Sequence, residues 1–387
     1  MPAVVPHTHD VRKTQTRPWF IGSEIYRHSS YGPFHPLRVP RVSTVMDLCR
    51  AMGWIAPGQF VTSPRAKPAA LMSFHTPDYV AALQRAEATQ TVTDMDRARH
   101  GLGTANNPVF PEMYRRPATS AGAAMLAGEL LRSTGTVFTP AGGTHHGFPD
   151  RAGGFCYLND PVLGIQSLRR NGALRIAYVD IDAHHCDGVD HAFRDDPDTL
   201  LISTHEIGRW PRTGALDDAG VGNVLNVPLL AGAVDDDMAL VRDAVILPAL
   251  ALFRPDAIVL QCGADAVAED PQSRLTLSNN AHWDILRAVR PLATRLMVLG
   301  GGGYNPWSVG RLWSGNWAIL NDLPIPVVLP PAAQAVLAAL RWEGQRRITQ
   351  PPAHWITTLR DVPRQGPILD ATRHACDHLA ARLISWT

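Results

Sequence analysis

The sequence lacks an excess of charge of either sign. Its 387 residues contain 36 Lys and Arg against 35 Asp and Glu, and charged residues make up only 18% of the chain, below the roughly 25% of average globular proteins. Without a basic excess, phosphate contacts have no electrostatic driving force, so nucleic acid is not an expected partner. A hydrophobic content of 45% with so little net charge also excludes an intrinsically disordered chain.

Long apolar runs and paired cysteines are missing as well. No stretch reaches the roughly 18 apolar residues of a membrane span, and the polar start, residues 1–17, has no apolar segment of the kind that a signal peptide needs. The five cysteines are odd in number, widely separated and without a C-x-x-C pair, which argues against a disulfide framework. We therefore expect reduced thiols, a cytoplasmic location and no membrane partner.

From about residue 135, short apolar segments alternate with helical patterns. Because these segments are continuously apolar, we expect strands that are buried on both faces of a parallel sheet. Helical stretches such as 234–253 and 278–294 separate them, and this alternation predicts an α/β doubly wound fold. The expected strands cover residues 136–139, 176–179, 200–203, 257–261 and 296–299.

No composition break divides the chain before about residue 320, so one large domain over 19–323 is expected after a polar leader, 1–18. Beyond residue 324 the sequence is rich in proline and contains two helical patterns, near 332–342 and 369–384. We interpret residues 324–387 as a C-terminal appendage that packs on the domain.

Polar residues follow each of the five expected strands. In open parallel sheets, ligands bind beyond the carboxyl ends of the strands, so these residues are expected on one rim. One such residue is weak support for a site, but five strand ends together are a specific signal. In chain order the rim receives His145, His146, Asp180, Asp182, His184, His205, Asp265 and Tyr304.

The spacing of Asp180, Asp182 and His184 predicts metal ligands. In an extended chain, positions i, i+2 and i+4 share one side, and Asp265 follows an equivalent strand. Alone, such an Asp usually caps a helix; together, a His and two Asp with an open position suit catalytic Zn²⁺. Two carboxylates cancel the charge of the ion, so an external general base would help, and the His145–His146 pair is the candidate.

The glycine run 300–303 contains neither of the phosphate-loop patterns G-x-G-x-x-G and G-x-x-x-x-G-K-[ST]. We interpret it as a flexible loop that positions Tyr304. The cysteines beside these motifs, Cys156, Cys186 and Cys262, have no zinc spacing and are interpreted as small packing residues.

With these motifs in view, the sequence resembles the zinc-dependent histone deacetylase family, within the arginase–deacetylase superfamily. It is most similar to the bacterial acetoin-utilisation type, which shares the Gly-Gly-x-His-His form of class I deacetylases. The resemblance covers roughly residues 19 to 320 and preserves motif order. It is carried by FHPLRVPR (34–41), HTPDYV (75–80), GGTHHGF (142–148), GGFCYLND (153–160), YVDIDAHHCDGV (178–189), STHE (203–206), GADAVAEDP (263–271) and GGGGYN (300–305).

The resemblance implies a single α/β domain with an eight-stranded parallel sheet. It implies one Zn²⁺ on Asp182, His184 and Asp265, an acid–base pair formed by His145 and His146, and a Tyr304 hydroxyl that donates to the developing oxyanion. The resemblance also implies that Asp180 and Asp187 orient the two histidines. It implies a narrow acyl-lysine tunnel lined by Phe155, Gly154 and Trp210, with Arg41 at its floor. Finally, it implies a structural K⁺ surrounded by Asp180, Asp182, His184, Ser203 and Thr204.

The sequence departs from the family pattern at two places, and arginase is an alternative interpretation within the same superfamily. Asn106 stands where deacetylases of this type usually have an Asp that grips the substrate backbone, which puts peptide binding in more doubt than hydrolysis. The loop 207–214 is short, so the role of Trp210 is less firmly implied. Arginase needs two Mn²⁺ ions, but the chain lacks the further Asp-x-Asp that the second ion requires, because Asp265 is followed by Ala266 and Val267.

The leading functional prediction is an amidohydrolase that removes acetyl or other acyl groups from lysine side chains in peptides or proteins. An acetylpolyamine or other small-acylamine amidohydrolase is the runner-up, since it would use the same chemistry behind a different rim. A non-catalytic acyl-lysine binder is less expected, because it would not need His145, His146 and Tyr304. An interaction protein acting through its appendage is a fourth hypothesis, and the oligomeric state is left open.

Overall fold

The computed structural model describes residues 17–342, 348 and 350–386. All but two residues of the expected polar leader lie outside the described part. The described residues form an eight-stranded sheet in the order β2-β1-β3-β8-β7-β4-β5-β6, in which every neighbouring pair is parallel. The predicted α/β fold with an eight-stranded parallel sheet is therefore confirmed.

The five strands expected from the sequence are present, and β5 is longer than predicted because it continues to Glu206. Three further strands, β1, β2 and β6, were not predicted. The strands are β1 (Trp19–Gly22), β2 (Phe60–Thr62), β3 (Gly135–Thr139), β4 (Ile176–Asp180), β5 (Thr199–Glu206), β6 (Val224–Leu229), β7 (Ala257–Gln261) and β8 (Arg295–Leu299).

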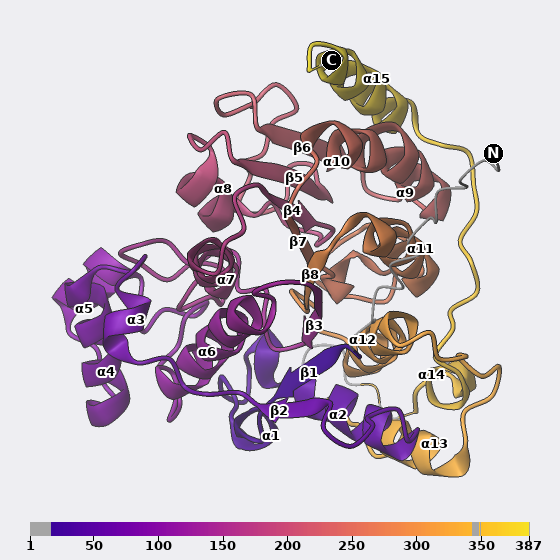
Figure 1. Cartoon of the computed structure of the whole chain (residues 1–387). Coiled ribbons are helices and arrows are strands. Elements are labelled where there is room, and N and C mark those ends of the chain that lie inside the picture. The colour runs from indigo at the N-terminus through magenta and orange to yellow at the C-terminus, as the bar shows by residue number, and fades with distance from the viewer. Residues whose placement is uncertain (1–16, 343–347, 349, 387) are drawn as a thin grey trace, which may run out of the picture.

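Helices cover both faces of the sheet, which Figure 1 shows nearly edge-on between them. One layer contains α6 (Arg115–Leu130), α7 (Asp160–Arg170) and α8 (Asp187–Phe193); the other contains α2 (Val42–Ala51), α9 (Asp235–Val241), α10 (Leu247–Phe253), α11 (Asn279–Val289) and α12 (Pro306–Leu320). In β4 the side chains alternate between the two cores: Ile176 and Tyr178 face the first layer, and Ala177 and Val179 the second. Burial on both faces explains the continuously apolar strand.

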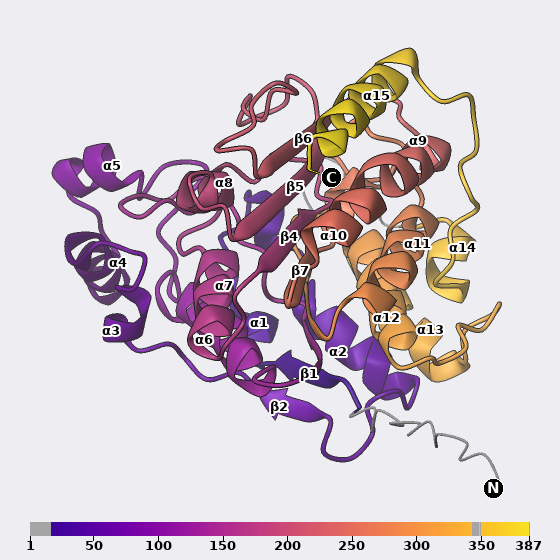
Figure 2. The ribbon, with the colours of Figure 1, turned by 45° about the horizontal axis from the view of Figure 1, so that its top comes forward.

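The remaining helices lie at the periphery. The N-terminal third of the chain contributes α1 (Ile25–His28), α3 (Pro68–Leu71), α4 (Pro77–Thr89) and α5 (Asp94–His100). The C-terminal segment contributes α13 (Pro331–Ala338), α14 (Ala353–Thr357) and α15 (Asp370–Ile384). In Figure 2, α13 and α14 lie beside α2 and α12, and the chain then crosses to place α15 near β6. Among the described residues, no helix combines the length and apolarity needed to cross a membrane.

The strand order creates the crevice that holds the site. The chain winds from β4 through β5 to β6 in one direction, whereas β7 and β8 run back toward β3. The order therefore reverses between the neighbours β4 and β7, where Asp180 pairs in register with Gln261. At such a reversal the connections leave the strands on opposite sides, and a crevice opens beyond their carboxyl ends.

Candidate metal centre and active site

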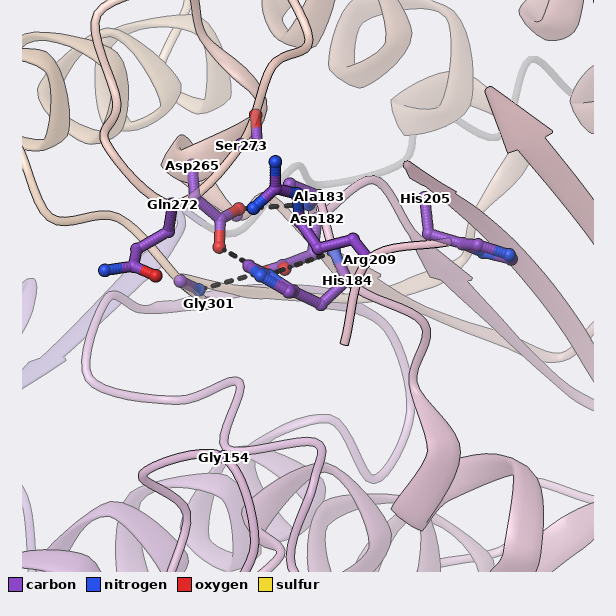
Figure 3. Close-up of polar contacts among 12 residues, drawn as sticks. Gly154, Asp182, Ala183, His184, His205, Arg209, Asp265, Gln272, Ser273 and Gly301 are labelled. Atoms are coloured by element: carbon purple, nitrogen blue, oxygen red, sulfur yellow. Dashed lines mark hydrogen bonds and ion pairs between the residues drawn. The ribbon is translucent and has the colours of Figure 1, made fainter. Parts of the chain in front are cut away.

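Asp182, His184 and Asp265 meet in this crevice. One ligand atom from each lies within 4.8 Å of the others, and Figure 3 shows the three side chains converging while His205 lies apart from them. The His184 Nδ1 atom is 3.0 Å from Asp265 Oδ2 and 3.2 Å from Asp182 Oδ1. All three residues are at most 8% exposed.

A turn, and not extended backbone, brings Asp182 and His184 together. The strand β4 ends at Asp180, so the alternation expected from positions i, i+2 and i+4 stops there. The Asp182 N–H donates to Asp180 Oδ1 and the His184 N–H to Asp182 Oδ1, each at 3.0 Å. Asp180 consequently points to a histidine outside this group, and only Asp182 and His184 join Asp265.

The charge and chemistry of this group fit a divalent cation. Burial alone would lower the pKa of His184, but the carboxylates of Asp265 and Asp182 outweigh it and raise that pKa to about 10. The group thus concentrates negative potential where water is largely excluded. Two carboxylates and an imidazole are ligands that Zn²⁺ accepts, and three protein ligands leave a coordination position open for a substrate. The residues therefore suit a catalytic metal ion.

Two adjacent histidines stand beside this group, each held by its own carboxylate. His145 Nδ1 lies 2.7 Å from Asp180 Oδ2, and His146 Nδ1 lies 2.7 Å from Asp187 Oδ1. These pairs fix Nδ1 as the protonated nitrogen and leave Nε2 of each ring free for chemistry. The ring centroids of the histidines are 4.0 Å apart, and both side chains line the same cavity as the Asp-His-Asp group.

The two histidines differ in their pKa values. Burial lowers the pKa of both, but at His145 the charges of Asp180 and Asp182 outweigh burial and raise the pKa to about 9. At His146, burial and the neighbouring His145 lower the pKa to about 4, against the opposing charge of Asp187. Near neutral pH the pair therefore combines a proton donor with an unprotonated base, which is what general acid–base catalysis requires.

Tyr304 lines the cavity at the end of the glycine run. Burial, followed by the charges of Asp265 and Asp182, raises its pKa well above the ordinary value, so the hydroxyl remains a hydrogen-bond donor. The Tyr304 and Asn305 N–H groups both donate to Asp270 Oδ2, at 2.6 and 3.2 Å. The carboxylate of Asp270 therefore fixes the backbone that carries the phenol.

The glycine run is closely packed, which differs from the flexible loop expected from the sequence. A Cβ at Gly302 would lie 2.0 Å from Asp265 Oδ2, and one at Gly300 would lie 2.3 Å from the Pro140 carbonyl oxygen. Gly301 and Gly303 have φ angles of +122° and +139°, which favour glycine. The run is glycine-rich because its backbone passes directly against the Asp-His-Asp group.

At the mouth of the cavity the structure places three of the four predicted substrate-binding residues. Gly154 and Phe155 line the cavity; the ring of Trp210 lies 4.6 Å from that of His146, at the rim, and a Cβ at Gly154 would come within 2.4 Å of it. Asn106, in contrast, is exposed and does not line the cavity; its carbonyl oxygen lies 3.1 Å from the His35 ring.

Several site residues were not predicted. Asn107, next to the expected Asn106, accepts a hydrogen bond from the Phe155 N–H at 3.1 Å and so holds the cavity wall. Gln261 lies 2.9 Å from His145 Nδ1, and the Tyr178 hydroxyl lies 2.6 Å from Asp180 Oδ2 and 2.7 Å from Gln261 Oε1. The position of Gln261 at a predicted strand end was the available signal, but amides at strand ends are too common to mark a site alone.

The residues expected for K⁺ and for the tunnel floor also lie at this edge. Asp180 and Ser203 are register partners in β4 and β5, and Thr204 Oγ1 lies 3.4 Å from the Asp180 carbonyl oxygen. Arg41 lines the cavity and donates from Nη1 to the Gly301 carbonyl oxygen at 2.7 Å.

A parallel α/β sheet with a buried Asp-His-Asp group at its reversal point defines a class of enzyme that can hold a metal ion at the carboxyl edge of the sheet. The family model described as the histone deacetylase domain matches residues 35–320. The chain therefore belongs to the histone deacetylase family.

Relatives of known name and structure agree with this assignment. The chain is 32% identical over 346 residues to the acetoin utilization protein AcuC of Bacillus subtilis, covering 86% of this chain and 88% of that protein. It is 34% identical over 323 residues to histone deacetylase RPD3 of Saccharomyces cerevisiae, covering 81% and 73%. The structure of a histone deacetylase homologue from Aquifex aeolicus superposes with a TM-score of 0.89 at 33% identity, covering 94% of this chain and all of that one.

Proposed function

We propose that the chain hydrolyses the side-chain amide of acyl-lysine, with the residues of this crevice in the roles described below. Membership of the histone deacetylase family makes it a hydrolase of linear amide bonds and a lysine deacetylase. The observation that supports the proposed roles is that the two carboxylate-paired histidines open onto one cavity with the Asp-His-Asp group and Tyr304. Nothing in the site favours the acylpolyamine alternative.

We propose Asp182, His184 and Asp265 as the ligands of one Zn²⁺. When bound, this ion supplies Lewis-acid polarisation of the amide carbonyl and makes an attacking water more acidic. A structural K⁺ at Asp180, Asp182, His184, Ser203 and Thr204, and the cytoplasmic location expected from the sequence, stay predictions.

The side chains of the cavity divide the proton transfers between them. His146, unprotonated at neutral pH, accepts the proton of the attacking water at Nε2 while Asp187 holds its Nδ1–H. The Tyr304 hydroxyl donates to the oxygen of the tetrahedral intermediate as negative charge develops there. His145, protonated beside Asp180, supplies a proton to the leaving lysine amine. Phe155 and Gly154 line the approach for the lysine stem, and Trp210 stands at its rim.

Removing the Tyr304 hydroxyl tests the oxyanion role. The variant Tyr304→Phe should lose roughly 10²–10³ in kcat on an acetyl-lysine peptide, as expected for a lost oxyanion donor, while its folding is retained. Steady-state kinetics with circular dichroism as the folding control would check this. Near-full activity in this variant would exclude the assigned role of Tyr304.

Replacing a proposed ligand tests the metal site. Asp182→Ala should abolish zinc retention and activity together, because two remaining ligands hold the ion weakly. Metal analysis of the dialysed protein gives the zinc content, and Asp217→Ala, which replaces an exposed carboxylate that does not line the cavity, is the matched control. One zinc per chain in Asp182→Ala would contradict the ligand assignment.

A further inference from the structure

The inner end of the cavity is lined by two arginines. Arg41, Arg116, Tyr26 and Tyr31 line the cavity, and all but the partly buried Arg41 are at most 7% exposed. Gly154 and Phe155 line it beside Trp210, which is 43% exposed and marks the outer end. Arg41 is tied to the glycine run next to the Asp-His-Asp group through its bond to the Gly301 carbonyl oxygen. An amide bound at that group, with its lysine stem toward the rim, would therefore direct its acyl chain toward the arginines.

Neither guanidinium has a carboxylate partner within ion-pair distance among the described residues. Arg41 is partly buried, and its buried Nε has no hydrogen-bond partner; burial lowers its pKa. Arg116 is 7% exposed, donates from Nη1 to the Ser29 carbonyl oxygen at 2.7 Å and lies over the Tyr26 and Tyr31 rings, at 5.5 and 5.2 Å. One buried and one partly buried guanidinium thus lack a directly paired carboxylate, an arrangement that binding of an anion would stabilise.

Other groups around the inner end strengthen the preference for an anion. The Tyr26 side chain is 5% exposed, and its hydroxyl has no hydrogen-bond partner, so a buried donor is available. The buried carboxylate on this side, Asp160, already accepts from the Gly143 and Thr144 N–H groups at 2.8 and 2.9 Å. It reduces the positive potential but leaves the inner end with two cations and a free hydroxyl.

The size of the cavity limits what can occupy it. Its volume is about 50 Å³, which favours a short acyl group over a long one. A carboxylate on a one-carbon spacer is a short anionic acyl end that can accept hydrogen bonds from two guanidinium groups and a phenol. A long fatty acyl chain fits neither the volume nor the charge of the inner end.

We propose, on the basis of the function proposed above, that this enzyme accepts lysine carrying a short acyl group that ends in a carboxylate, of the malonyl class. The acyl carbonyl would lie at the Asp-His-Asp group, and the terminal carboxylate between Arg41, Arg116 and the Tyr26 hydroxyl. Water adds to the amide carbon, the C–N bond breaks, and the lysine amine takes up the proton, so that malonate and free lysine result without any redox change.

Comparing two acyl groups of equal shape tests the proposal. Malonyl and isovaleryl have the same number and branching of heavy atoms, but only malonyl is charged. The kcat/KM of the wild-type enzyme should be about tenfold or more higher on a malonyl-lysine peptide than on the isovaleryl peptide, since charged hydrogen bonds are worth 1.5–3 kcal/mol or about 10–10² in rate. A preference for isovaleryl, or equal rates, overturns the proposal, whereas absent turnover of acetyl-lysine would instead contradict the proposed function.

Two variants separate recognition of the carboxylate from a loss of folding. Arg116→Met and Tyr26→Phe should each lower the malonyl-to-isovaleryl ratio, by about tenfold and severalfold respectively, and Arg116→Lys should retain part of it. Tyr26→Phe removes a hydroxyl that has no partner, so the fold should tolerate it. Arg287→Met, which replaces an exposed arginine paired with Asp284 at 2.8 Å, is the matched control. An unchanged ratio in both test variants overturns the assignment of the inner end.

Binding of free malonate gives a readout that does not depend on turnover. Calorimetry on the chelator-treated protein should show tighter binding of malonate than of isovalerate, and Arg116→Met should abolish this difference in affinity. Because no metal is present in that experiment, chelation by malonate cannot produce the signal. If acetate binds as strongly as malonate, the inner end holds only a released product carboxylate, and the proposed acyl specificity is wrong.

Discussion

The pKa of each of the two site histidines is set by the charged groups around its ring. His145 and His146 are sequence neighbours with equal burial, yet their pKa values lie near 9 and near 4 because two carboxylates face the first ring and a charged imidazole faces the second. The sequence predicted that these residues form a pair. It could not assign which one is protonated, because the deciding charges are those of Asp180, at the end of β4, and Asp182, in the turn that follows.

His75 offers a test of residue environment outside the crevice. It is 1% exposed, its Nδ1 lies 3.0 Å from the Phe148 carbonyl oxygen, and its Nε2 accepts the Asn159 N–H at 3.0 Å. The second bond requires an unprotonated Nε2, and burial lowers the pKa of His75 from 6.5 to about 4. The unfolded chain therefore binds a proton between pH 6.5 and 4 that the folded chain excludes.

This difference gives a pH dependence with a defined sign. The contribution of His75 to stability is fully present above pH 6.5 and is lost as the pH falls toward 4. Between pH 7 and pH 5, the loss in unfolding free energy should be about 2 kcal/mol smaller in His75→Gln than in the wild type. Urea unfolding at both pH values measures it, with the exposed His354→Gln as control. Equal losses in His75→Gln and the wild type would show that the ring does not titrate as described.

At the scale of elements, the ends of the strands decide the site. The apolar segments predicted β3, β4, β5, β7 and β8 correctly because burial on both faces leaves an unmistakable run of residues. The strands β1 and β2 are only four and three residues long, too short for a distinct apolar run, and the edge strand β6 (VLNVPL) contains a polar Asn226 and a Pro. Pairing with a neighbour, and not local sequence, makes these segments strands, so single-segment patterns could not identify them.

The glycine run between β8 and α12 makes a further prediction. Gly302→Ala should lower kcat/KM by about 10², because its Cβ would meet Asp265 Oδ2 at 2.0 Å and displace either this carboxylate or the backbone leading to Tyr304. Peptide kinetics and bound-zinc analysis would measure both effects. Gly366→Ala is the control, since its Cβ would make an ordinary contact with Val234 at 3.5 Å. Full activity in Gly302→Ala would mean that the run is as flexible as its composition suggests.

At the scale of the whole molecule, the C-terminal segment is packed into the domain. Leu337, Trp355, Leu359 and Leu379 are at most 5% exposed and belong to the main core cluster. The fully buried Arg311 of α12 pairs with Asp361 and donates from Nε to the Thr358 carbonyl oxygen at 2.9 Å. Residues 324–387 thus supply both apolar cover and the countercharge of a buried cation.

We therefore expect that a chain ending at Leu323 does not fold stably. Removing the segment exposes apolar core and leaves Arg311 without its partner, and the loss of a buried ion-pair partner alone costs about 3–5 kcal/mol, much of the stability of a typical domain. Circular dichroism and size-exclusion chromatography of the truncated chain measure the outcome. A monodisperse, active truncated enzyme would show that the segment is a separable appendage.

The sequence by itself determined the class of fold, the central strands and the identity of the polar residues at their carboxyl ends, because continuous apolar runs and the residues that follow them are local features. Only the tertiary structure decided that the strand order reverses between β4 and β7, that a turn and not a strand joins Asp182 to His184, and that Arg116 shares a cavity with Arg41. These facts depend on contacts between residues far apart in the chain, and such contacts leave no periodic trace in the segments that make them.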